Sequence, residues 1–120
     1  MRHDEDNEAM VLMRWAALMQ VAGIGRISDY LIAIPNGGKR NPREAARLKR
    51  MGVKGGVSDY FLAFPRNGFH GLWIELKAEG GRVSEAQGEW IKRMRLAGYQ
   101  ATIAWGWTEA REAILYYLEP

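Results

Sequence analysis

The sequence predicts an α/β protein with a mixed central β-sheet that is flanked by helices on both faces. The periodicity of its apolar residues gives the order helix, strand, short helix, strand, strand, helix, strand, helix, which a mixed two-sided sheet accommodates. An apolar content of 48% over 120 residues is enough for one compact core. The sequence contains no repeat, low-complexity tract or linker, so residues 1–120 are expected to form a single domain.

The composition also excludes several classes of protein. No apolar run approaches the roughly 20 residues of a membrane span, and the first residues lack the apolar stretch of a secretion signal. Without cysteine the chain has neither a disulfide framework nor a thiolate metal site. We therefore expect a cytoplasmic protein without a membrane partner.

A first helix is expected over residues 4–20. Its apolar stripe consists of Val11, Trp15, Leu18 and Ala22, widened by Leu12 and Met19. Glu8 lies one turn before the start of this stripe, so its side chain is expected on the face toward the core. The alternative is an acid of the first helical turn, favoured by the helix dipole, as we interpret Glu5 one turn earlier.

A first strand is expected over residues 28–34. It ends at Pro35 and the Asn-Gly-Gly turn that follows, where free backbone N–H groups could hold a phosphate; an ordinary turn is the alternative. Asn41 as N-cap and Pro42 at the first helical position then begin a short helix that ends near Met51, before Gly52.

This second helix belongs to a strongly basic segment. Residues 39–54 contain seven basic residues and one acid, a net charge of +6, whereas the whole chain carries +3. Such a segment suits the phosphate backbone of a nucleic acid, although a solvated helix face is the plainer interpretation. The candidate phosphate-binding residues of the loop and the helix are Asn36, Gly37, Gly38, Lys39, Arg40, Arg43, Arg47 and Lys54.

The next two apolar runs, residues 57–64 and 71–77, flank a segment with turn chemistry and predict an antiparallel hairpin. Strand alternation separates the apolar residues of the second strand from Glu75 and Lys77, which share the opposite face. Asp59 begins the first strand and is therefore expected beside them. A core does not need two carboxylates and an ammonium group at one end of a sheet, because buried charge is costly unless it binds a metal or a partner.

We interpret these three residues as a site. Carboxylate oxygens without cysteine or clustered histidine favour Mg²⁺ or Mn²⁺, which Asp59 and Glu75 would bind directly. Lys77 would orient an attacking water or stabilise charge on a phosphate. The alternative is a surface salt bridge between Glu75 and Lys77, with Asp59 capping a turn.

The remaining elements are a helix from Ser84, a strand over residues 99–105 and a last helix over residues 109–118 with Thr108 as its cap. Ser84 and Gln87 fit a capping box, in which the Gln87 side chain bonds the Ser84 backbone. Gln87 also lies on the helix face toward the sheet, so it could instead hydrogen-bond a metal-bound water or the Lys77 region.

Asp59 followed by Glu75-x-Lys77 matches the signature of the restriction-endonuclease-like nucleases. In its order of motifs, over nearly the whole chain, the sequence resembles the VRR-NUC (virus-type replication-repair nuclease) family in its compact stand-alone form. Ser58 is a departure, because the family usually has proline before the aspartate; proline would stiffen the turn but ligates nothing. The further matching segments are Glu8, residues 35–40, residues 51–57, residues 84–87 and Gly98-Tyr99.

The resemblance implies a restriction-endonuclease-like core and a Mg²⁺- or Mn²⁺-dependent DNA endonuclease. It implies that Glu8 completes the acidic site, that the backbone carbonyl of Leu76 supplies another metal ligand, and that Gln87 supports the site. Stand-alone members look like phage or prophage nucleases that act as homodimers on branched DNA such as four-way junctions, which places the protein in the cytoplasm of a bacterial or phage-infected cell. Apolar surface for such a dimer is offered by Trp105, Trp107, Tyr116 and Tyr117.

Two other functions fit the same residues. The chain could be a catalytically silent DNA-binding module that keeps the fold and the basic helix, although every catalytic residue type is present. It could also hydrolyse small phosphoesters, although the basic segment extends farther from the site than a small ligand requires.

Overall fold

The computed structural model describes residues 2–35 and 41–120 of the chain. Four strands form the main sheet in the order β3-β4-β5-β6, and two short strands form a separate hairpin. The helices and strands are α1 (Arg2–Leu18), β1 (Gln20–Val21), β2 (Gly25–Arg26), a 3₁₀-helix η1 (Ile27–Asp29), β3 (Leu31–Ala33), α2 (Pro42–Arg50), β4 (Tyr60–Leu62), β5 (Leu72–Lys77), α3 (Glu85–Leu96), β6 (Gln100–Trp105) and α4 (Trp107–Leu118).

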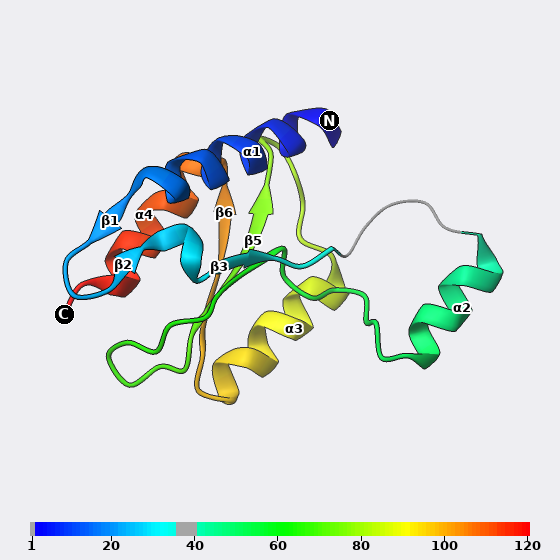
Figure 1. Cartoon of the computed structure of the whole chain (residues 1–120). Coiled ribbons are helices and arrows are strands. Elements are labelled where there is room, and N and C mark those ends of the chain that lie inside the picture. The colour runs from blue at the N-terminus through cyan, green and yellow to red at the C-terminus, as the bar shows by residue number, and fades with distance from the viewer. Residues whose placement is uncertain (1, 36–40) are drawn as a thin grey trace.

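The main sheet is mixed and covered on both sides. β3 pairs with β4 and β4 with β5 in antiparallel fashion, whereas β5 and β6 are parallel. Helices α1 and α4 cover one face and α3 covers the other (Figure 1). The predicted α/β fold is thus confirmed. None of the helices in the described part of the chain is long and apolar enough to cross a membrane.

The face of α1 that enters the core differs from the predicted stripe. Leu12 and Ala16 are fully buried, whereas Leu18, assigned to the stripe, is 84% exposed. Toward the start of the helix, the same face carries Glu8 and Glu5, which are half-buried. The helix is therefore rotated so that two carboxylates follow its apolar face.

Three further elements differ from the prediction. The β1–β2 hairpin was not predicted, and residues 27–29, expected mostly as strand, form the 3₁₀-helix before β3. Helix α4 begins at Trp107, with Gly106 in the cap position in place of Thr108. The Trp107 backbone N–H donates to Glu8 Oε1 at 2.7 Å, so a side chain from α1 caps this helix.

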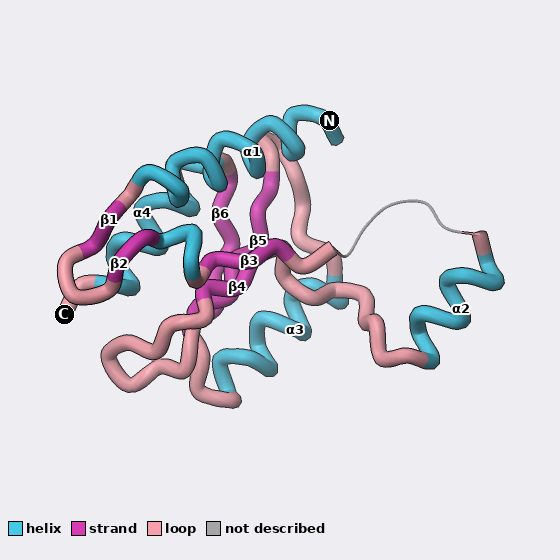
Figure 2. Tube along the Cα trace, in the orientation of Figure 1, coloured by secondary structure: helices cyan, strands magenta, loops and turns pink. Residues whose placement is uncertain are grey.

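Helix α2 stands apart from the sheet (Figure 2). Asn41 caps it as predicted, because its Oδ1 accepts a hydrogen bond from the Glu44 backbone N–H at 2.7 Å. None of its nine residues is buried. The helix therefore adds little to the core and presents its basic residues to solvent.

Candidate active site

Asp59 lies immediately before β4 and reaches across to the end of β5. The strand register pairs Tyr60 with Ile74, which brings Asp59 alongside Glu75. The Leu76 backbone N–H donates to Asp59 Oδ2 at 2.7 Å. Because the N–H and C=O groups of a strand residue point to the same side, the Leu76 carbonyl also faces Asp59.

The glycine-rich loop before Asp59 is held close to α3. Gly56 has a φ of +85°, and a Cβ atom built on it would lie 2.7 Å from the backbone carbonyl carbon and oxygen of Ala86. Both the positive φ and the close approach require glycine at this position. This contact fixes the loop against the start of α3, on the same side of the sheet as Gln87.

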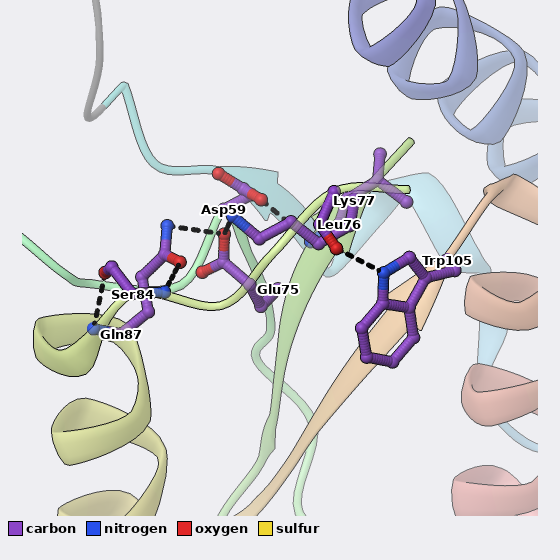
Figure 3. A network of polar contacts seen from close by, with 8 residues as sticks. Asp59, Glu75, Leu76, Lys77, Ser84, Gln87 and Trp105 are labelled. Atoms are coloured by element: carbon purple, nitrogen blue, oxygen red, sulfur yellow. Dashed lines mark hydrogen bonds and ion pairs between the residues drawn. The ribbon is translucent and has the colours of Figure 1, made fainter. Parts of the chain in front are cut away.

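Glu75 is a buried carboxylate with two neighbours and one unpaired oxygen. Glu75 is 1% exposed, and its side chain projects from the face of β5 that α3 covers (Figure 3). Oε2 accepts a hydrogen bond from Gln87 Nε2 at 3.0 Å and lies 3.5 Å from Lys77 Nζ. Oε1 is buried and has no hydrogen-bond partner among the described residues. Buried polar atoms are usually paired, and this oxygen is free to accept a hydrogen bond or to bind a cation.

The environment of Glu75 opposes its ionisation. Burial and then the negative charge of Asp59 raise the pKa of Glu75 from 4.5 to about 8, against the opposing effect of Lys77. Perturbation of this kind, with desolvation as its first cause, is typical of functional sites. A cation beside the two carboxylates would favour the ionised form.

Gln87 forms the predicted capping box and also contacts Glu75. Its backbone N–H donates to Ser84 Oγ at 3.1 Å and its Oε1 accepts from the Ser84 N–H at 2.9 Å, which confirms the capping box. The amide group that remains, Nε2, is the donor to Glu75. The cap therefore fixes the orientation of the amide that holds the carboxylate.

The structure separates the two acids of α1. Glu8, the residue expected to complete the acidic site, accepts the Trp107 N–H at the start of α4. Glu5 instead interacts with the site: burial and then the charge of Asp59 raise its pKa, and Lys77 lowers it. Glu5 and Lys77 also line a hollow of about 320 Å³ with residues 78–82. Glu8 lines a different hollow, with Glu79, Gly80, Trp105 and Gly106.

The donor groups fit a divalent cation bound in part by water. No group of three or more histidine, aspartate and glutamate side chains that could enclose a metal occurs in residues 2–35 and 41–120. Mg²⁺ needs fewer, because it keeps several waters and is usually held by one or two carboxylates together with substrate phosphates. Asp59, the unpaired oxygen of Glu75 and the Leu76 carbonyl meet that requirement.

The predicted phosphate-binding residues are only partly described. Asn36, Gly37, Gly38, Lys39 and Arg40 lie outside the described residues. Arg43 and Arg47 are exposed on α2, and Lys54 is exposed in the loop after it. Arg47 Nη1 lies 3.5 Å from Met51 Sδ, so this side chain extends along the helix.

The four aromatic residues considered for a dimer surface separate into two pairs. Tyr116 and Trp105 are 76% and 43% exposed. Tyr117 is buried, and its hydroxyl donates to the Phe64 carbonyl oxygen at 2.7 Å. Trp107 packs against the core, and the Arg111 guanidinium lies 5.0 Å from its ring centre. Tyr117 is therefore not available as surface, contrary to the expectation.

Comparisons with known proteins point to one family. The sequence profile of the VRR-NUC domain matches residues 14–106. A solved structure described as a VRR_NUC domain protein is 34% identical in sequence and superposes with a TM-score of 0.83, covering 95% of this chain and 87% of that one. No curated protein sequence matches the chain significantly.

Proposed function

Since the chain belongs to the VRR-NUC domain family, a family of nucleases, we propose that it is a metal-dependent endonuclease that hydrolyses phosphodiester bonds in branched DNA. The observation that carries the proposal is the state of Glu75. A buried carboxylate with an unpaired oxygen, beside Asp59 and Lys77, costs stability unless a cation and a phosphate complete it.

In this proposal some residues of the site bind the metal, and Lys77 acts on the water or the phosphate. Asp59, Glu75 and the Leu76 carbonyl would hold Mg²⁺ or Mn²⁺. The bound cation would lower the pKa of a water molecule and offset charge on the scissile phosphate. Gln87 keeps Glu75 in one orientation, and Lys77 orients the attacking water or stabilises the charge that develops on the phosphate.

We propose that the acid contributed by α1 is Glu5 and that Glu8 is a helix cap. Glu5→Ala is expected to lower the cleavage rate about tenfold and to leave the melting temperature unchanged. Glu8→Ala should leave the cleavage rate of the folded protein unchanged and lower the free energy of unfolding by about 1 kcal/mol, because the α4 N-terminus loses its cap. Single-turnover cleavage and urea unfolding of both variants separate the two roles; the reverse pattern would return the site role to Glu8.

The basic residues of α2 are proposed to bind the DNA backbone. Arg43, Arg47 and Arg50 follow one another at spacings of four and three residues, which places them on one face of the helix. A stripe of guanidinium groups contacts phosphates without reading sequence, so selectivity is expected to depend on DNA shape. Together with Lys54 and the loop residues Asn36 to Arg40, this stripe would hold DNA beside the metal site.

We propose that the protein acts on branched DNA as a homodimer. Two active sites related by a two-fold axis suit paired incisions in a symmetric junction, such as those of DNA repair and recombination. The exposed Tyr116 and Trp105 offer part of the apolar surface. The absence of cysteine agrees with a cytoplasmic protein of a bacterium or phage-infected cell.

The test compares wild type with Asp59→Ala on labelled four-way junction, flap and linear duplex DNA, with Mg²⁺, Mn²⁺ or EDTA. We expect the wild type to cut the junction in the presence of metal, with symmetric incisions, and the variant to bind the same DNA without cutting it. A gel shift by wild type that EDTA does not affect, with no cleavage of any substrate, would identify a DNA-binding module instead.

A further inference from the structure

Trp105, named above for its exposed apolar surface, also lies beside the proposed active site. In the parallel register of β5 and β6 it is the partner of Lys77, so the two side chains project from the same face of the sheet. This is the face that carries Glu75. The residue is 43% exposed, whereas tryptophan is highly buried on average.

Two hydrogen bonds fix this tryptophan. Its backbone N–H donates to Glu109 Oε1 at 2.9 Å. Its indole Nε1 donates to the backbone carbonyl of Gly81 at 2.9 Å (Figure 3). Gly81 belongs to the loop after β5, where its own N–H donates to the Ala78 carbonyl at 2.9 Å. The indole therefore ties this turn to the end of β6.

Gly81 in turn lies against the aliphatic stem of Lys77. A Cβ atom built on Gly81 would lie 3.3 Å from Lys77 Cβ and 3.4 Å from Lys77 Cδ. The Lys77 side chain is 12% exposed, and its Nζ lies 3.5 Å from Glu75 Oε2. The turn thus covers the stem, while the ammonium group extends to the carboxylate.

A lysine ammonium group is carried on four rotatable methylene groups, so its position depends on what packs against the stem. We propose that Trp105 is a positioning residue for Lys77, which it holds through the carbonyl of Gly81. This inference rests on the nuclease function proposed above. It assigns the exposed indole to the geometry of the catalytic ammonium group and not to contact with DNA.

The variant that tests it is Trp105→Phe, which keeps an aromatic ring and loses the N–H donor. We expect kcat for junction cleavage to fall roughly threefold to tenfold, as the loss of one hydrogen bond would allow, with KM unchanged within about twofold. Trp15→Phe, in a partly buried tryptophan of α1 packed against the core cluster, is the matched control and should leave kcat unchanged. Thermal unfolding of each variant shows whether the fold is retained.

A second variant changes Gly81, the residue that lies between Trp105 and the Lys77 stem. Gly81→Ala places a methyl group 3.0 Å from the Ala78 carbonyl oxygen and within 3.3 Å of the lysine stem, so it should lower kcat about tenfold or more. If the two act through one path, the double variant should lose no more than the larger single loss.

The outcomes are distinct. A rise in KM with unchanged kcat in Trp105→Phe would mean that the indole contacts DNA and would overturn the inference, as would unchanged kinetics or additive losses in the double variant. If the wild type cuts no DNA under any condition, the proposed function fails, and the role of Trp105 in catalysis is overturned with it.

Discussion

Replacing Glu75 by glutamine is expected to lower the rate of DNA cleavage roughly a hundredfold or more while the protein remains folded. The substitution keeps the volume of the side chain and an oxygen that can accept the Gln87 amide. It removes the negative charge that would hold the metal. Single-turnover cleavage of the preferred DNA, over a range of Mg²⁺ concentrations, measures the loss, and higher metal concentrations should recover part of it if metal affinity is the quantity changed.

The matched control for this experiment is Glu112→Gln, an isosteric change at an acid on α4 whose side chain is 69% exposed. Its cleavage rate and metal dependence should equal those of wild type. Cleavage by Glu75→Gln at the wild-type rate would exclude Glu75 as a metal ligand and would remove the main support for the assigned site.

The second large effect concerns the metal-free protein. We expect its free energy of unfolding to decrease as the pH rises from about 5 to 8. The pKa of Glu75 is about 8 in the folded protein and about 4.5 in the unfolded chain. Between these values the folded state binds more protons than the unfolded state, so the group contributes stability fully below pH 4.5 and loses it as the pH rises through 8. The total loss is on the order of 5 kcal/mol.

Urea unfolding in EDTA at several pH values, for wild type and Glu75→Gln, isolates this contribution, since the other titrating groups are common to both proteins. The variant should gain stability over wild type as the pH rises toward 8, with a constant difference above it. Mg²⁺ should reduce the gain, because a cation favours the ionised carboxylate. A difference in stability that does not change with pH would show that Glu75 titrates normally in the folded chain.

Much of the fold could be predicted because its signals are local. The capping box at Ser84, the Asn41 cap and the alternation along β5 each specify structure within a few residues. The two predictions that failed at α1 and α4 depended on residues that are distant in the sequence. The rotation of α1 and the start of α4 are both set by packing between helices that are far apart in sequence, which a periodicity argument does not contain.

The candidate site shows the same division. The position of Asp59 beside Glu75 and Leu76 followed from strand register, and the orientation of Gln87 from its cap. The sequence does not distinguish Glu5 from Glu8, because both lie on the same face of α1. In the structure Glu8 accepts the Trp107 N–H, and the charges of Asp59 and Lys77 act on Glu5. The contact of Trp105 with Gly81 joins a strand end to a turn and has no sequence signature.

The bond between Glu8 and Trp107 also constrains the order of folding. It joins residues 99 positions apart, and α1 packs on α4 around it. During synthesis α1 is made first, yet the helix that covers its apolar face is made after the whole sheet. Until then Leu12 and Ala16 lack this partner. Closure of the domain is therefore a late, long-range step, which favours slow folding and leaves the nascent chain open to aggregation.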